Sequence, residues 1–379
     1  MKVTGPVETK HTSFLFQKSF NTMEDPRRTD KGNFYYPLQE IFFLSISAML
    51  CGFNSWLAIS TFGEEKLEWL RKFFPFENGT PSHDALGKVF SKLDPVMFSE
   101  CFTNWVSSLI ELMDGEIVAF DGKTIRGSGA AGKGKKALHI VSAFAAGNRI
   151  CLGQTGVDAK ENEIVAIPEL LDLIEIKGCT VTIDAMGCQK KIAKKIRQKE
   201  AHYLLMVKDN QQELKSQVQK MFEFKRPNDT HEDLDAGHGR VENRKCESIS
   251  DLKFFDTKED WFDLNTVVRI KSERYDKKTG KTGMDTRYYI SSLPSDAKSI
   301  LNAARSHWAV ENTLHWNLDV VMKEDSALKK NGNSAQNTNI MAKIALYMLE
   351  KEKSVKKTKP QKMNKAALND RYREKLLML

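Results

Sequence analysis

The stretch that decides the fold is Glu116-Ile117-Val118-Ala119-Phe120-Asp121-Gly122-Lys123-Thr124. Its four consecutive apolar residues predict a buried strand, after which the chain becomes polar at Asp121. A carboxylate at the end of a strand, beside a glycine that permits close approach, is a common way to present a metal ligand. The alternative is an Asp-Gly turn that closes a hairpin, and for this dipeptide alone the turn is more common. The rest of the chain has to distinguish a ligand from a turn.

The pattern that follows this stretch predicts a mixed α/β sheet. We expect, in order, strands at 137–144 and 149–154, a helix at 163–173, a strand at 179–184, a helix at 189–199 and a strand at 203–207. Three strands, then helix, strand, helix and strand is the order of a ribonuclease-H-like sheet. A repeating βαβ fold would alternate from its first strand.

The regions on either side of this core have other patterns. Residues 1–20 read as an N-terminal arm and residues 21–114 as an all-α domain, which suits a DNA-binding module and a structural bundle equally well. A β-rich insertion is expected at 211–294, inside a catalytic domain that spans 115–350. Residues 351–379 read as a basic tail, solvated or following phosphates.

Composition limits the possible environments and partners. The net charge of +8 over 379 residues favours a polyanionic partner such as nucleic acid. The six cysteines are widely spaced without a zinc-binding pattern, so we expect buried thiols in a reducing cytoplasm. The longest apolar run, 41–50, is too short to span a bilayer, so no membrane partner is expected.

A second aspartate follows a second apolar strand, in Ile183-Asp184-Ala185-Met186. If the two strands are neighbours, Asp121 and Asp184 meet at one edge of the sheet, where they would repel each other unless a cation lies between them. Such oxygen ligands suit Mg²⁺. Taken alone, Asp184 would more commonly cap the next helix.

A third carboxylate is expected on the long helix that starts at about residue 295. By α-helical spacing, His307, Glu311 and His315 share one face, so a zinc site is an alternative, although the His-Glu-x-x-His spacing is absent. Trp308 and Trp316 are expected in the core rather than as platforms for bases. Glu324 and Asp325 are rivals to Glu311 as the third ligand.

Several motifs together resemble one family, the H-repeat-associated, ISAs-type group of DDE insertion-sequence transposases. The resemblance covers roughly 20–350 in order. It rests on the stretches Asp25-Pro26-Arg27-Arg28, Tyr36-Pro37-Leu38, Phe120 to Ser128, Thr182 to Gln189, His238 to Arg244, Tyr289 to Leu293, His307 to Asn312 and Leu314 to Val320.

The resemblance implies a ribonuclease-H-like nuclease with a catalytic and metal-binding triad of Asp121, Asp184 and Glu311, using Mg²⁺ or Mn²⁺. Water would attack a phosphodiester at the end of the element, and the freed 3′-hydroxyl would attack target DNA. The partners would be double-stranded DNA, as terminal inverted repeats and as target, and a second copy on that DNA. Candidate contacts to DNA are Lys123, Arg126, Lys190, Lys208, His238, Arg240, Arg305 and His307.

Two other functions remain open from the sequence. A domesticated or inactive relative would bind DNA without moving it, although the intact triad favours activity. A nuclease with the same core would cleave DNA without joining strands.

Overall fold

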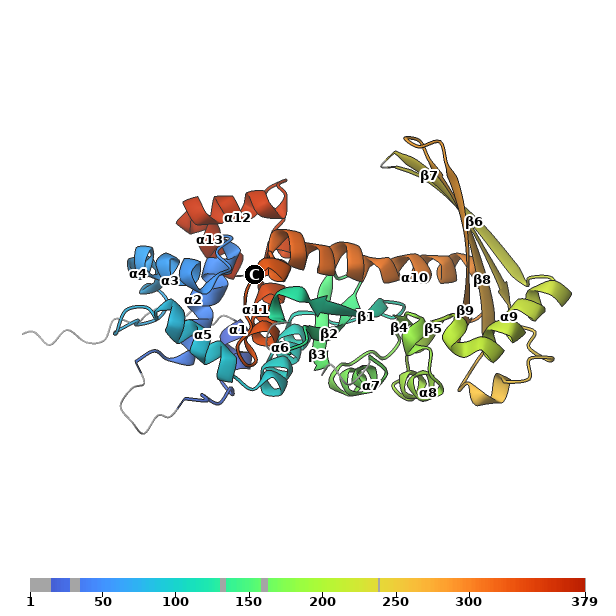
Figure 1. Ribbon diagram of the computed structural model, residues 1–379, viewed down its shortest axis with the longest axis horizontal. Coiled ribbons are helices and arrows are strands. Elements are labelled where there is room, and N and C mark those ends of the chain that lie inside the picture. The colour runs from blue at the N-terminus through green and yellow to red at the C-terminus, as the bar shows by residue number, and fades with distance from the viewer. Residues whose placement is uncertain (1–14, 28–34, 130–133, 158–162, 238, 379) are drawn as a thin grey trace, which may run out of the picture. The chain divides into compact units, whose positions relative to one another are not determined.

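The computed structural model describes residues 15–27, 35–129, 134–157, 163–237 and 239–378, and it divides into two compact units (Figure 1). The sheet unit comprises Glu111–Lys123 and Ile140–Leu314. The helical unit comprises the described residues up to Ile110, those of Thr124–His139, and those from His315 onward. Each unit is described by itself.

Five strands make the first part of the sheet: β1 (Ile117–Ile125), β2 (Leu138–Ala145), β3 (Ile150–Val157), β4 (Thr180–Ile183) and β5 (His202–Val207). Their spatial order is β3-β2-β1-β4-β5, and β4 is parallel to both β1 and β5. The N–H of Ala146 donates to the carbonyl of Ile117 (2.9 Å), so β2 runs antiparallel to β1. This is the predicted ribonuclease-H-like arrangement, and the predicted fold class is confirmed.

Helices cover both faces of the five strands. α7 (Glu163–Leu173) and α8 (Lys190–Gln198) lie on one face and α10 (Ala297–Ala309) lies on the other (Figure 1). Each turns an apolar stripe inward, because apolar residues at helical spacing gain free energy by leaving water. The buried residues of α10 pack with buried side chains of β5, β7, β8 and β9 in one cluster that includes Ile300, Leu301, Leu204, Cys246, Val268 and Tyr289.

The insertion extends the same sheet instead of forming a separate one. It contains α9 (Gln212–Phe224), β6 (Asp229–Gly237), β7 (Arg240–Ile249), β8 (Thr266–Asp276) and β9 (Thr282–Ser291). β9 pairs antiparallel with β5, and the order continues β9-β8-β7-β6, which gives nine strands.

Strand β6 was not predicted, because its acidic sequence is typical of a loop. Across the β6–β7 ladder two of its carboxylates, Glu232 and Asp233, lie opposite the basic residues Lys245 and Arg244. Glu232 lies opposite Lys245 and forms a 2.9 Å ion pair with it. Cross-strand pairs of opposite charge stabilise a sheet by tenths of a kcal/mol to about 1 kcal/mol each, which offsets poor strand propensity.

The helical unit is built from both ends of the chain. Its helices are α1 (Leu15–Phe20), α2 (Leu38–Leu50), α3 (Trp56–Glu65), α4 (Leu67–Leu70), α5 (His83–Lys92), α6 (Pro95–Leu109), α11 (Ser334–Lys351), α12 (Lys359–Leu368) and α13 (Asp370–Leu377). The helix predicted at 40–56 ends at Leu50, because Gly52 takes φ +89° and breaks it. The α11 amide of Asn337 donates to the carbonyls of Phe90 and Leu93, at 2.9 and 3.0 Å.

The segment predicted as a basic tail is folded as α12 and α13. Arg373 is fully buried, with its guanidinium 3.9 Å from the centre of the Trp69 ring and paired with Asp370. Buried Glu352 accepts a hydrogen bond from Tyr372 (3.0 Å) and lies 3.8 Å from the ammonium of Lys362. These charges are therefore compensated inside the helical unit, as burial of charge requires.

All six cysteines are buried and unpaired with one another, as predicted. Within the described residues, no helix is both long enough and apolar enough to cross a membrane.

Substitution of Gly187, in the turn that follows β4, tests how tightly this turn is packed. A Cβ there would lie 2.2 Å from Ile183 Cγ2 and 3.0 Å from Ile167 Cδ1. We expect Gly187→Ala to lower the free energy of unfolding by about 1–3 kcal/mol, measured by urea denaturation. Gly283→Ala is the control, because its added Cβ has nothing within 4 Å. Equal midpoints for the two variants would contradict the expected overpacking.

Candidate active site

The register of two parallel strands brings the first two predicted carboxylates together. β1 pairs with β4 from Ile117↔Thr180 to Phe120↔Ile183. Asp121 and Asp184 are the next residue on each strand, so they stand side by side at the same level. Neighbouring strands lie about 4.8 Å apart, which places both side chains at one edge of the sheet.

The end of β1 differs from its predicted end. The strand continues through Asp121 to Ile125, and only its pairing with β4 stops at Phe120. The Asp-Gly dipeptide therefore lies within a strand, and the hairpin-turn alternative is wrong. Hydrophobicity alone could not show this, because pairing with a neighbour keeps a polar segment extended.

Asp184 has the local role that its position suggested. Its carboxylate accepts a hydrogen bond from the N–H of Met186 (2.9 Å) and caps the short 3₁₀ helix Ala185–Gly187. This bond orients one carboxylate oxygen and leaves the other available. Capping and ligand binding are therefore compatible at this residue.

Glu311 comes from the helical segment after α10. The predicted continuous α-helix changes at Val310 to a π-helical segment, Val310–His315, and a second π-helical segment spans Asn317–Val321. π-helical turns are rare and occur frequently at functional sites. The wider turn also moves His315 off the predicted α-helical stripe, and its side chain is buried whereas Glu311 is exposed.

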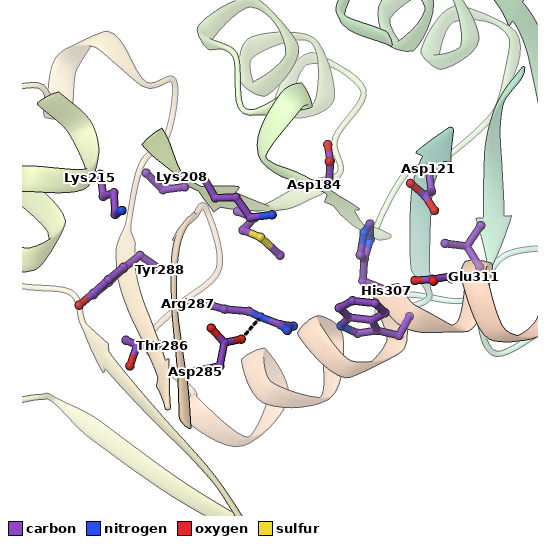
Figure 2. A pocket seen from close by; sticks show the side chains of 14 residues that line it. Asp121, Asp184, Lys208, Lys215, Asp285, Thr286, Arg287, Tyr288, His307 and Glu311 are labelled. Atoms are coloured by element: carbon purple, nitrogen blue, oxygen red, sulfur yellow. Dashed lines mark hydrogen bonds and ion pairs between the residues drawn. The ribbon is translucent and has the colours of Figure 1, made fainter. Parts of the chain in front are cut away.

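Asp121, Asp184 and Glu311 line one pocket of the sheet unit, with a volume of about 380 Å³ (Figure 2). Glu324 and Asp325 belong to the helical unit. Glu324 accepts a hydrogen bond from Asn339 (2.5 Å) and Asp325 accepts one from the N–H of Arg126 (3.0 Å). Glu311 is therefore the candidate third carboxylate that the sheet unit itself supplies. The remaining pocket-lining residues are Met206, Val207, Lys208, Lys215, Asp285, Thr286, Arg287, Tyr288, His307, Trp308 and Val310.

The electrostatics of Asp121 show how crowded the site is with negative charge. Burial and, after it, the charges of Glu163, Asp184 and Glu311 together raise the pKa of Asp121 to about 7, against one backbone hydrogen bond from Gly122 that lowers it. Without a cation, these carboxylates disfavour one another's ionised form. A perturbed carboxyl in a cleft is a candidate functional group.

His307 links the helix to strand β4. Its Nδ1 lies 3.0 Å from Thr182 Oγ1, and Thr182 is two residues before Asp184. Burial lowers the pKa of His307, although Asp184 and Thr182 oppose this effect. In this position the imidazole acts as a hydrogen-bonding group that joins α10 to β4.

Trp308 is exposed, so its predicted place in the core is wrong. Its side chain is 40% exposed, and Trp316 is 54% exposed. The guanidinium of Arg287 lies 5.1 Å from the centre of the Trp308 ring and donates to Asp285 (2.7 Å; Figure 2). Trp308, Asp285 and Arg287 also line a second cavity of about 640 Å³, beside Arg240, Arg244, Arg274 and Arg305.

The predicted DNA-binding residues have different surroundings. Lys208 lines the carboxylate pocket and Arg240 lines the second cavity. Lys190 pairs with Asp260 at 2.8 Å, and Arg305 forms ion pairs with Asp233 and Asp235. Lys123 is half-buried in β1, and exposed Arg126 pairs with Asp325. His307 lines the carboxylate pocket. His238 lies outside the described residues.

The donor set of the pocket fits a divalent cation. Mg²⁺ and Mn²⁺ prefer carboxylate oxygens and commonly keep several waters. Asp121, Asp184 and Glu311 supply such oxygens, and their mutual repulsion would fall when a cation binds. Among the described residues, no three side chains of His, Cys, Asp or Glu already stand at metal-binding distances. The carboxylates would therefore have to close around an ion.

Comparison with known proteins bears on this geometry. The family model described as Transposase DDE domain matches residues 113–349, and the model described as DDE_Tnp_1-associated matches residues 17–106. The chain belongs to the DDE transposase family. It is 41% identical to "Putative transposase YncI" of Escherichia coli O157:H7, over 93% of this chain and 92% of that protein.

Two further relatives concern the group within the family and the question of catalytic activity. The chain is 38% identical to "H repeat-associated putative transposase YhhI" of Escherichia coli K12, over 89% of this chain and 91% of that protein. The predicted membership of the H-repeat-associated group of DDE transposases is thus confirmed. A third relative, "Inactive transposase YbfQ" of the same strain, is 39% identical over 15% of this chain and 68% of its own length. Family membership therefore does not by itself establish activity.

Sequence reasoning missed several lining residues, among them Lys215, Asp285 and Arg287, and it also missed Glu163, whose charge acts on Asp121. Arg287 was absent from the candidates because its strand was assigned to an insertion, whereas β9 is hydrogen-bonded to β5. Glu163 was missed because a glutamate in the first turn of a helix has an ordinary local explanation. The run of four polar residues Asp285-Thr286-Arg287-Tyr288 before an apolar strand end was the available signal for side chains at a cleft.

The raised pKa of Asp121 makes a prediction about the cation-free protein. The folded pKa is about 7 and the unfolded value is 3.8, so between these pH values the folded state binds more protons. The free energy of unfolding should therefore fall, by a few kcal/mol, as pH rises from about 4 to 7. The Asp121→Asn variant should not show this fall. In EDTA, thermal denaturation should show that this variant is more stable than the unaltered protein, by a margin that grows between pH 5 and 8. A gain independent of pH would contradict the assignment, and Glu169→Gln, exposed on α7, is the control.

Proposed function

We propose that this protein is an active transposase of an insertion sequence, with Asp121, Asp184 and Glu311 as its catalytic carboxylates. The observation that carries the proposal is the convergence of these three side chains on one pocket from β1, the turn after β4 and the helix after α10. The reaction is hydrolysis of a phosphodiester at the element end, followed by attack of the freed 3′-hydroxyl on target DNA.

The three carboxylates would hold Mg²⁺ or Mn²⁺ during this reaction. When bound, such a cation acts as a Lewis acid on the phosphodiester and stabilises charge that develops on the leaving oxygen. The chain's own residues position the ligands: the N–H of Met186 orients Asp184, and the bond between Thr182 and His307 fixes α10 against β4. A pocket built on strands and a packed helix holds such ligands more accurately than loops do.

Basic and aromatic side chains beside the carboxylates support DNA as the substrate. Lys208 and Arg287 line the pocket, and the face of Trp308 is exposed beside Arg287. Guanidinium and ammonium groups bind phosphates, and an exposed aromatic face stacks on bases of any sequence. The arginines of the second cavity would continue this surface along β7, β8 and β9. Joining two element ends would require at least two copies of the chain on DNA.

The main alternative is a relative that binds DNA without moving it. One cleavage assay separates the possibilities. Cleavage followed by strand joining supports the transposase, cleavage without joining indicates a nuclease, and binding without cleavage by the unaltered protein indicates an inactive relative.

Substitution of each triad residue tests the catalytic assignment. With Mg²⁺ and a duplex of the element end, Asp121→Asn, Asp184→Asn and Glu311→Gln should each reduce cleavage by a thousandfold or more, roughly what loss of a main electrostatic element costs. DNA binding, followed by fluorescence anisotropy, should remain. Asp209→Asn is the control, because Asp209 follows β5 but pairs with Lys215 at 2.7 Å. Cleavage at the unaltered rate would remove that residue from the mechanism.

DNA affinity should depend on salt and on Trp308 in separable ways. Contact with about six phosphates would weaken binding about a thousandfold between about 50 and 200 mM salt. Arg240→Ala should reduce the salt slope by about 1. Trp308→Ala should weaken binding by about 1–3 kcal/mol without changing the slope, because stacking releases no counterions. A flat salt response would count against the basic surface, and an unchanged affinity against the aromatic platform.

A further inference from the structure

A further carboxylate, Glu163, acts on Asp121 in addition to those that line the pocket. Glu163 is the first residue of α7 and is half-buried. Among charged groups, Glu163 has the strongest effect on Asp121, ahead of Asp184 and Glu311. Glu163 is not among the residues that line the pocket.

The topology explains why Glu163 reaches this edge of the sheet. β2 is antiparallel to β1, and only four residues separate β2 from β3, so β3 runs in the direction of β1. β3 therefore ends at the edge where Asp121 and Asp184 stand, and α7 begins six residues later. The first turn of α7 is thus directed to the carboxylate edge, and the rest of the helix leads away from it.

Packing of the next helical turn fixes Glu163 in this place. Ile167 follows Glu163 by four residues and so lies on the same helix face. Ile167 Cδ1 reaches within 3.0 Å of the position of a Cβ on Gly187, in the turn that Asp184 caps. The face of α7 that carries Glu163 is therefore packed against the turn that carries Asp184.

We propose that Glu163 is a further cation ligand of the catalytic centre and binds a divalent cation together with Asp121. This inference rests on the proposed function of the pocket. Cations at phosphoryl-transfer sites stabilise both the attacking and the leaving oxygen when two of them stand about 3.5–4 Å apart. Glu163 would give Asp121 a further carboxylate partner, from the first turn of α7.

A structural role for Glu163 makes a different prediction. A glutamate in the first turn of a helix stabilises that helix through its dipole by about 0.3–1 kcal/mol. That role would change unfolding and leave cation binding unaltered. Glu169 provides the matched control, because it is on the same helix but exposed.

The test is Mn²⁺ binding to the full chain without DNA, followed by electron paramagnetic resonance of the free ion. We expect Glu163→Gln to reduce Mn²⁺ affinity about tenfold or more, or to remove one bound ion, whereas Glu169→Gln matches the unaltered protein. Equal number and affinity of ions in Glu163→Gln and Glu169→Gln would overturn the inference.

Two further variants keep the outcome interpretable. Asp121→Asn should also weaken Mn²⁺ binding; if it does not, the proposed function of the pocket fails together with the inference. If Asp121→Asn weakens binding and Glu163→Gln does not, only the inference about Glu163 fails. Should Glu163→Gln not fold, Glu163→Asp keeps the charge but shortens the side chain. Its affinity should fall several-fold, and an unchanged affinity would overturn the proposal.

Discussion

The parallel ladder between β1 and β4 is the constraint on which the site depends. Its last pair, Phe120↔Ile183, fixes the relative level of Asp121, which lies within β1, and of Asp184, which directly follows β4. A shift of one residue would turn one carboxylate to the opposite face of the sheet, because side chains alternate along a strand. Phe120 and Ile183 are almost completely buried, so the hydrophobic core holds the register that the chemistry requires.

Charge compensation recurs in both units of the molecule. In the sheet of the insertion, Asp233 and Asp235 pair with Arg244 and Arg305. In the helical unit, buried Arg373 pairs with Asp370. The carboxylates around Asp121 instead raise the pKa of one of their own members. Like charges gathered around one pocket favour the binding of a cation there.

Particular residues show how far prediction from the sequence extended. The strands and helices from β1 to β5 were predicted within a few residues, because each carries a clear apolar period and a turn at its end. The exposure of Trp308 and the strand β6 were not predicted, and the reason is the same for both. Exposure of a tryptophan beside Arg287 and the pairing of an acidic strand with Lys245 both depend on residues distant in the chain.

The sequence alone determined the family, the order of the core elements and the identity of three candidate carboxylates, since these depend on local pattern and on motifs in order. Tertiary structure decided which side chains share a pocket, because strand register and helix packing are set by contacts between distant segments. It extended β1 through Asp121, changed the helix at Glu311 to a π-helical turn, and packed Ile167 of α7 against the turn that follows β4. The opening stretch thus presents Asp121 from within a strand, held by its neighbours rather than by a turn.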